Sequence, residues 1–233
     1  MNSISVRLQQ VLGQIENAAS TSYKKSSNVN LLAVSKTKPV TDVQALYALG
    51  QRQFGENYQQ EAVEKIQYLQ QLGGYPDIVW HFIGPIQSNK TRPIAEHCDW
   101  VQSIDRLKIA QRLNDQRPDN MAKLNVCIQV NISAEESKSG TDIAQAQLLA
   151  AQISELPNLV LRGIMAIPEK TGDEEKLKSQ FNQLESLYLS LQDQYSQIDT
   201  LSMGMTNDME LAIANGSNMV RVGTALFGAR DYT

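Results

Sequence analysis

The sequence predicts an α/β fold, a single-domain (β/α)8 TIM barrel with an extra helix at its N-terminus. Strand-like and helical segments alternate from Leu31 onward, which is typical of parallel βαβ units. Eight strand segments occur in this order, and 233 residues is close to the size that such a barrel needs. No Gly-x-Gly-x-x-Gly turn follows the first strand, which argues against an open dinucleotide-binding sheet.

The N-terminal segment 3–19 is expected to be an amphipathic helix. Its apolar residues recur at helical spacing: Ile4, Leu8, Val11, Leu12 and Ile15. Residues 20–30 are polar and are expected to form a linking loop. We therefore expect residues 1–30 to be a helix and loop packed on the barrel, and residues 31–233 to be the barrel itself.

The remaining elements follow from hydrophobic periodicity. Strands are predicted at 31–35, 52–54, 78–83, 99–103, 123–131, 159–166, 199–202 and 218–222. Helices are predicted at 42–49, 58–72, 88–96, 105–116, 142–155, 174–195 and 207–215. The helix at 174–195 is the clearest, because its apolar side chains keep a 3.6-residue period over five turns.

Composition narrows the function classes. A net charge of -4 and a pI near 5.3, without a basic run, argue against nucleic acid or an anionic membrane as a partner. Two cysteines provide neither a disulfide framework nor a metal-binding spacing, so we expect no metal. No apolar stretch approaches the roughly 20 residues that a bilayer span needs, and the N-terminus lacks a signal-peptide core. We expect a soluble, cytoplasmic protein.

Lys36 is the main candidate for chemistry. It closes the apolar run 31–35 and therefore lies at the carboxyl end of the first predicted strand, where parallel barrels bind ligands. One interpretation is an ordinary solvent-exposed lysine. The other is a partly desolvated amine that forms a Schiff base with a carbonyl ligand.

Two later strand ends favour the second interpretation. Gly223 and Thr224 precede a short apolar segment, and Gly204 and Thr206 repeat this arrangement one strand earlier. Barrels commonly hold phosphate in the loops after strands seven and eight, through backbone N–H groups at a helix start. Either loop alone fits a simple tight turn. Both loops together, opposite Lys36, favour a phosphorylated carbonyl ligand.

A set of short motifs carries a family resemblance. They are AVSK at 33–36, FGENY at 54–58, WHFIG at 80–84, QSNK at 87–90, VNI at 130–132, KSG at 138–140, GIM at 163–165 and LSMGM at 201–205. In this order they resemble the YggS/PROSC-like pyridoxal phosphate homeostasis proteins, which are similar to the barrel half of fold-type III enzymes such as alanine racemase. The chain departs at Thr206, where the family usually has serine, although a hydroxyl remains.

The resemblance implies roles for the two charged candidates. Lys36 would carry pyridoxal 5'-phosphate (PLP) as a Schiff base. Arg221 would face the pyridine nitrogen, as the corresponding arginine does in the racemase. Because a guanidinium stays protonated, Arg221 would keep the ring nitrogen unprotonated and weaken the cofactor as an electron sink.

The resemblance also implies the remaining cofactor contacts. Thr206, Gly223 and Thr224 would hold the phosphate, with Ser202 a weaker candidate. Asn57, His81 and Met203 would line the ring. For His81 a hydrogen-bonded core position is the competing interpretation, and for Met203 it is ordinary core packing.

The function hypothesis follows from what the chain lacks. A PLP racemase needs an acid or base opposite the lysine, which in alanine racemase comes from a partner's second domain. Tyr58 and His81 are the nearby candidates, and neither has a telling spacing. The resemblance likewise implies no established catalytic activity. Together they favour a monomeric, non-enzymatic PLP-binding protein that takes part in PLP homeostasis and buffers PLP or delivers it to apoenzymes. A small PLP-dependent racemase and a cofactor-free class I aldolase are the alternatives.

Overall fold

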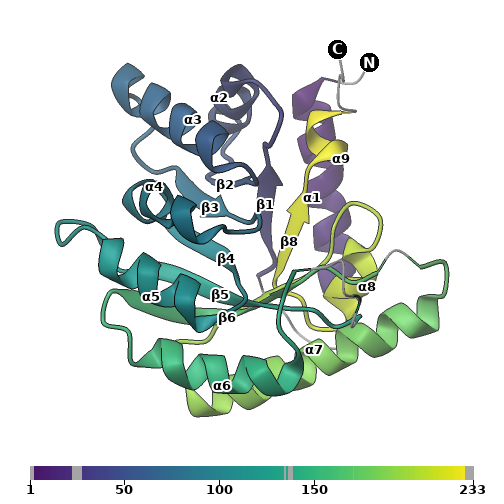
Figure 1. Cartoon of the computed structure of the whole chain (residues 1–233). Coiled ribbons are helices and arrows are strands. Elements are labelled where there is room, and N and C mark those ends of the chain that lie inside the picture. The colour runs from purple at the N-terminus through teal and green to yellow at the C-terminus, as the bar shows by residue number, and fades with distance from the viewer. Residues whose placement is uncertain (1–2, 23–27, 134, 136–138, 170, 229–233) are drawn as a thin grey trace.

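The computed structural model describes residues 3–22, 28–133, 135, 139–169 and 171–228. Eight parallel strands form a closed barrel in chain order, surrounded by helices (Figure 1). The strands are β1 (Asn30–Val34), β2 (Gln53–Glu56), β3 (Val79–Phe82), β4 (Trp100–Ile104), β5 (Leu124–Val130), β6 (Leu159–Ala166), β7 (Thr200–Ser202) and β8 (Met219–Val222). The predicted (β/α)8 barrel is confirmed, and every strand lies within two residues of its predicted position.

The helices also follow the predicted order. They are α1 (Ile4–Thr21), α2 (Val40–Ala48), α3 (Gln59–Leu72), α4 (Thr91–His97), α5 (Leu107–Gln116), α6 (Ile143–Ser154), α7 (Glu174–Gln194), α8 (Met209–Ala214) and α9 (Thr224–Phe227). The predicted helix 88–96 is divided: Ser88–Lys90 is a 3-10 turn and α4 begins only at Thr91. Pro93 explains the difference, because a proline is tolerated in the first turn of an α-helix but not in its interior.

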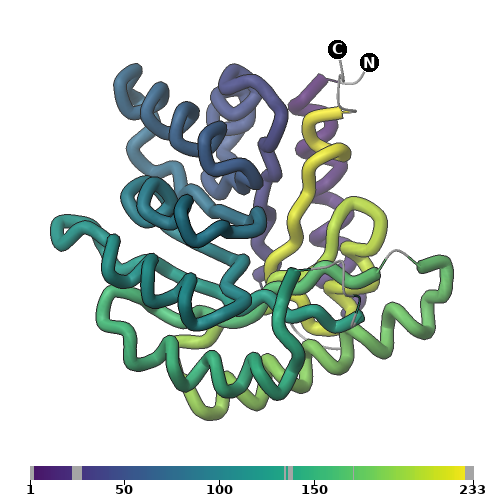
Figure 2. The backbone as a smooth tube through the Cα atoms, in the orientation of Figure 1, coloured from purple at the N-terminus to yellow at the C-terminus, as the bar shows by residue number. Residues whose placement is uncertain are grey.

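The barrel closes where β1 pairs with β8. Leu32 lies opposite Arg221, and Ala33 lies opposite Val222. In Figure 2 the purple start and the yellow end of the chain therefore run side by side. Closure places the ends of the first and last strands at the same rim, so that residues almost 190 positions apart become neighbours.

The strands separate two regions of buried side chains. On β1, Leu31 and Ala33 belong to the large apolar cluster shared with the surrounding helices, whereas Leu32 and Val34 are buried outside it. Because successive strand residues point to opposite faces, Leu32 and Val34 belong to the barrel interior.

Helix α1 packs on α8 and α9, beside the closing strand β8 (Figure 1). Leu8, Val11 and Ile15 are its buried residues, and the Arg7 side chain donates to the carbonyl oxygen of Leu226. Residues 23–27 of the predicted loop lie outside the described residues, and the boundary at residue 30 stays a prediction. Over the described part of the chain, no helix has the length and apolar character required to traverse a membrane.

Gly163 on β6 lies unusually close to β7. A Cβ built at Gly163 would be 1.8 Å from the carbonyl oxygen of Thr200, and the residue has a φ of +152°. Replacement by alanine must separate two paired strands. We expect Gly163→Ala to lower the free energy of unfolding by about 2–3 kcal/mol or more, measured by denaturant titration.

Gly13 supplies the control for this prediction. It lies inside α1, and a Cβ there would meet no atom within 4 Å. Because glycine disfavours helix interiors, Gly13→Ala should raise the free energy of unfolding by about 0.5–1 kcal/mol. Equal stability of the two variants would show that the close approach of β6 and β7 does not constrain the fold.

Candidate functional site

A cavity of about 630 Å³ opens at the carboxyl rim of the barrel. It is lined by Val34, Lys36, Lys38, Asn57, Ile83, Ile167, Pro168, Glu169, Thr171, Leu177, Met205, Thr206, Asn207, Asp208, Arg221, Gly223, Thr224, Phe227 and Gly228. Most of these residues follow or end a barrel strand, so the cavity lies where the fold predicts the ligand site. Its volume falls in the roughly 300–1,000 Å³ range of small-molecule sites.

The cavity brings together six of the eight residues expected to contact a cofactor. These are Lys36, Asn57, Thr206, Arg221, Gly223 and Thr224. His81 and Met203 are not among the described residues that line it, and both are almost fully buried. Their contact with a cofactor ring stays a prediction.

Lys36 directly follows the buried residue Ser35 and is partly exposed at the rim. Its neighbour Thr37 has a φ of +62°, a left-handed conformation that a β-branched residue rarely adopts. The reactive candidate therefore begins an irregular turn rather than continuing a regular strand.

Arg221 places a buried cation in the cavity wall. Its Nη1 donates to the carbonyl oxygen and the Oγ of Ser202, at 2.7 and 2.9 Å, and its Nη2 donates to the carbonyl oxygen of Ala166 at 2.8 Å. Burial lowers the pKa of Arg221 to about 10, so the guanidinium is charged at neutral pH. A guanidinium has five N–H donors, so it keeps the capacity to bind a ligand acceptor.

A chain of polar side chains continues from Arg221 through the barrel interior. The Ser202 hydroxyl donates to Gln102 Oε1 at 2.7 Å, and Gln102 Nε2 lies 2.9 Å from His81 Nδ1. An amide nitrogen can only donate, so Nδ1 accepts and the proton of neutral His81 lies on Nε2. The Ser202 hydroxyl is thus engaged inside the barrel and does not line the cavity.

His81 is a buried residue of β3 whose ring stacks on Trp100, with centroids 5.0 Å apart. Burial lowers the pKa of His81 to about 3, so the imidazole is neutral at physiological pH. Its Nε2 has no hydrogen-bond partner among the described residues. This environment matches the competing interpretation of His81 as a hydrogen-bonded residue of the barrel interior.

The two loops expected to bind phosphate have the glycines that their geometry needs. Gly204 has a φ of +95°, and a Cβ there would lie 2.7 Å from the Cβ of Ala212. Gly223 is the N-cap of α9, and a Cβ there would lie 3.3 Å from the carbonyl oxygen of Val34. Thr206 and Thr224 are exposed at the cavity mouth. Backbone amides and two hydroxyls thus surround one side of the opening.

Sequence reasoning missed Asp208. Its Oδ1 accepts a hydrogen bond from the backbone N of Met205 at 2.6 Å, which closes the loop after β7. The carboxylate also raises the pKa of Arg221 and so opposes part of the effect of burial. The available signal was an acidic residue three positions after Met205, the spacing at which a side chain reaches back to a backbone N–H in a capping box.

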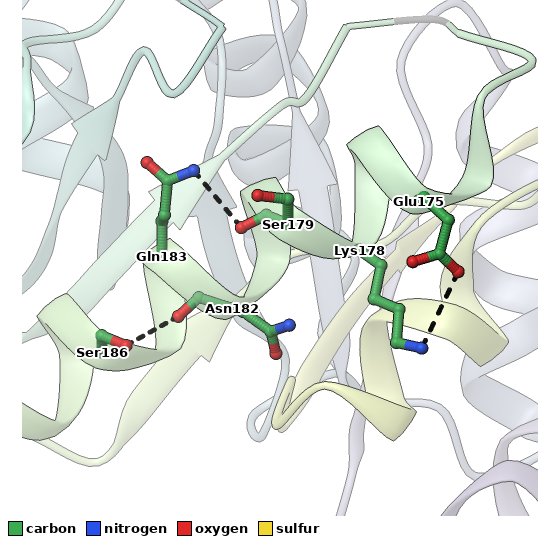
Figure 3. Close-up of a pocket in the computed structure, with 6 residues that line it drawn as sticks. All are labelled: Glu175, Lys178, Ser179, Asn182, Gln183 and Ser186. Atoms are coloured by element: carbon green, nitrogen blue, oxygen red, sulfur yellow. Dashed lines mark hydrogen bonds and ion pairs between the residues drawn. The ribbon is translucent and has the colours of Figure 1, made fainter.

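A second, smaller hollow lies on the outer face of α7 (Figure 3). Its six lining residues, all exposed, come from this one helix: Glu175, Lys178, Ser179, Asn182, Gln183 and Ser186. Its contacts are local, such as the pair between Lys178 and Glu175 at 4.0 Å. It is the solvent face of a helix and lacks the buried charge that marks the rim cavity.

The neutral His81 should make stability depend on pH. Above pH 6.5 the imidazole is neutral in both states, whereas between pH 6.5 and about 3 only the unfolded chain takes up the proton. Stability is therefore lost as the pH falls through this window, by up to about 1.4 kcal/mol per pH unit. His81→Gln should flatten the dependence of the free energy of unfolding on pH between 7 and 5, measured by denaturant titration.

His97 is the other histidine of the chain and supplies the matched control. It lies on α4, partly exposed, with Nδ1 near the carbonyl oxygen of Pro93. His97→Gln separates the loss of any histidine from the loss of the buried one. A His81→Gln slope equal to that of the unmodified protein would contradict the assignment of His81 as a buried neutral imidazole.

Comparison with known proteins adds independent findings. Residues 6–231 match the family model described as alanine racemase, N-terminal domain. The pyridoxal phosphate homeostasis protein of Escherichia coli K12 is 52% identical over 233 residues, which cover all of this chain and 99% of the relative. The two chains therefore correspond over their whole length.

Solved structures show the same barrel. The structure of PipY from Synechococcus elongatus PCC7942, described with PLP bound, has a TM-score of 0.83 and 35% identity, and covers 97% of this chain and 100% of PipY. An alanine racemase from Clostridium difficile 630 has a TM-score of 0.73 at 15% identity and covers 96% of this chain and 56% of the racemase, which shows the shared fold. The chain belongs to the family of pyridoxal phosphate homeostasis proteins, built on the fold of the alanine racemase N-terminal domain.

Proposed function

We propose that this protein binds PLP as a Schiff base on Lys36 and takes part in intracellular PLP homeostasis, as a cytoplasmic carrier rather than an enzyme. The observation that carries the proposal is the composition of the rim cavity. One wall holds a strand-end lysine and a buried arginine, and two glycine-containing loops with exposed hydroxyls surround the opening. The relative with PLP in its structure supports the identity of the ligand.

The residues present fit PLP better than a simple sugar phosphate. Lys36 can supply the amine that condenses with the PLP aldehyde, with loss of water. Thr206, Gly223 and Thr224 offer hydroxyl and backbone donors for a phosphate group. Arg221 offers remaining N–H donors for a ring nitrogen, and Asn57 lies on the same wall. The relative whose structure is described with PLP bound favours PLP over a sugar phosphate.

Arg221 also bears on the chemistry that bound PLP would supply. Bound PLP supplies an electron sink only when its ring nitrogen is protonated or well stabilised. The charged guanidinium of Arg221 donates hydrogen bonds, keeps its protons and has no acceptor atom, and three hydrogen bonds hold it in place. It therefore favours an unprotonated ring nitrogen and weakens the cofactor as an electron sink. Because the resemblance implies the same arginine in alanine racemase, the carrier proposal rests on the placement of acids and bases and not on Arg221.

Neither residue considered as an acid or base for a racemase is well placed. The ring of His81 lies in the barrel interior, and Tyr58 is 52% exposed at the N-cap of α3. Neither lines the cavity among the described residues. This arrangement supports a carrier whose cavity is open to solvent. In this role a monomer would deliver PLP to apoenzymes.

The Schiff base is tested by visible absorbance and borohydride reduction. The purified protein should be yellow or turn yellow with added PLP, and reduction should fix the cofactor to Lys36, as located by peptide mass. Lys36→Ala should abolish the fixed adduct. Lys178→Ala, which removes an exposed lysine from the α7 hollow, should retain it. A colourless protein that takes up no PLP would redirect the search to phosphorylated sugars.

The carrier role is tested by transfer. Two rates are compared: the rate at which the PLP-loaded protein restores the activity of a PLP-dependent apoenzyme, and the rate at which it loses PLP to a trapping amine in solution. The first rate should exceed the second. The PLP-loaded protein should itself turn over no amino acid. Racemisation that is abolished by Lys36→Ala and retained by Lys178→Ala would replace the carrier proposal with a small PLP-dependent racemase.

A further inference from the structure

A second lysine, Lys65 of α3, lies against the turn that carries Lys36. Its Nζ donates to the carbonyl oxygen of Ser35 at 2.8 Å, to Glu56 Oε1 at 2.8 Å and to Glu61 Oε1 at 2.7 Å. The Lys65 side chain is 8% exposed and that of Glu56 is 1% exposed. An ammonium has three N–H donors, so every donor of Lys65 is engaged and Lys65 is a structural cation.

The same group of side chains, which we call the Lys65 cluster (Glu56, Glu61 and Lys65), holds both neighbours of Lys36. On one side, the Ser35 hydroxyl donates to Glu56 Oε1 at 2.6 Å. On the other side, the backbone N of Thr37 donates to Glu61 Oε1 at 2.6 Å. Lys36 therefore lies between two residues, Ser35 and Thr37, that are each hydrogen-bonded to a carboxylate of the Lys65 cluster.

Thr37 is the strained point of this turn. Its φ of +62° is the one positive φ of a non-glycine residue within the described ranges. A β-branched residue keeps such a conformation only where its surroundings impose it. The hydrogen bond from the Thr37 N–H to Glu61 acts on this very residue, so loss of the Glu61 oxygen would let Thr37 relax and turn the Lys36 backbone.

We propose that Glu61, acting through Thr37 and Lys65, is a positioning residue that directs the Lys36 amine toward a carbonyl ligand in the rim cavity. The inference rests on the proposed function, since it concerns capture of PLP at the same site. Its physical basis is that attack on a carbonyl carbon depends steeply on the placement of the nitrogen, where a misplacement of about 1 Å can cost a factor of about 100.

The chain offers a matched set of variants on one helix. Glu61→Ala removes the oxygen that accepts from Thr37 and Lys65. Glu61→Gln keeps an oxygen at that position without the charge. Glu64→Ala removes the same charge from the exposed face of α3, where the Glu64 carboxylate accepts a hydrogen bond from the Gln60 side chain. Comparison of the three separates the Thr37 contact from charge and from helix composition.

Two quantities are measured for each variant. One is the rate constant for the appearance of visible absorbance on mixing with PLP, with the adduct on Lys36 verified by borohydride trapping. The other is the affinity for 4'-deoxypyridoxine 5'-phosphate, which has the ring and phosphate but no aldehyde. Glu61→Ala should slow capture at least about tenfold and leave the analogue affinity within about twofold. Glu61→Gln should recover most of the rate, and Glu64→Ala should match the unmodified protein.

The double variant Thr37→Gly/Glu61→Ala provides a second test, because glycine adopts positive φ without support. If Glu61→Ala folds, the double variant should recover part of the PLP capture rate that Glu61→Ala loses. If Glu61→Ala does not fold, the double variant should itself capture PLP more slowly than the unmodified protein. A wild-type rate in Glu61→Ala, or in the double variant where it alone can be purified, would overturn the inference. A parallel loss of capture rate and analogue affinity would also overturn it, since that outcome means general damage to the site.

The outcomes also separate this inference from the proposed function. Absence of a borohydride-stable adduct in the unmodified protein would overturn the proposed function together with the inference. An adduct on Lys36 in the unmodified protein, formed at the same rate in Glu61→Ala, would overturn the inference alone.

Discussion

Closure of the barrel between β1 and β8 is the constraint on which the site depends. The pairing of Leu32 with Arg221 and of Ala33 with Val222 sets the height of Lys36 relative to Arg221 and Gly223. A Cβ at Gly223 would lie only 3.3 Å from the carbonyl oxygen of Val34, so the last loop rests directly on the first strand. Without this one strand pair, the Lys36 amine near the start of the chain and the loop near its end that we propose to bind phosphate would have no common cavity.

The barrel interior supports the buried cation in the cavity wall. An isolated buried charge is costly, and Arg221 offsets this cost through three hydrogen bonds to oxygen atoms of Ser202 and Ala166. Ser202 is in turn fixed by Gln102, which also contacts His81. Because the His81 imidazole is neutral, the hydrogen-bonded series from Ser202 through Gln102 to His81 adds no second cation near Arg221. The polar interior therefore fixes the direction of the guanidinium.

Much of this could be predicted because the signals are local. The buried run before Lys36, the glycines before short helices and the alternating periods each lie within a few residues. They predicted the barrel and four residues of the cavity, whereas Asn57 and Arg221 were named from the family resemblance. His81 and Met203 were named from the family resemblance, and their contact with a cofactor stays a prediction: His81 lies within β3 rather than after it, and Met203 is fully buried. The direction in which a side chain at a strand end points depends on packing that no local pattern records.

The Lys65 cluster shows the other limit of local reasoning. On the sequence, Glu61 and Lys65 are an ordinary i,i+4 pair on a helix, which is usually solvated and contributes little to stability. Only the packing of α3 against β2 and the end of β1 brings Ser35 and Glu56 to this pair and buries Lys65, while the Glu61 side chain is 24% exposed. The burial of Lys65 is therefore a tertiary property, invisible in the spacing of charges along the helix.

The same packing explains how two neighbouring lysines acquire different roles. Lys65 lies outside the barrel wall with its three donors fixed by carboxylate and carbonyl oxygens, which is the environment of a structural cation. Lys36 lies on the opposite side of the strained turn, partly exposed in a cavity that also holds Arg221. One turn of backbone thus separates a lysine that is fixed by three hydrogen bonds from the lysine that we propose to bind PLP.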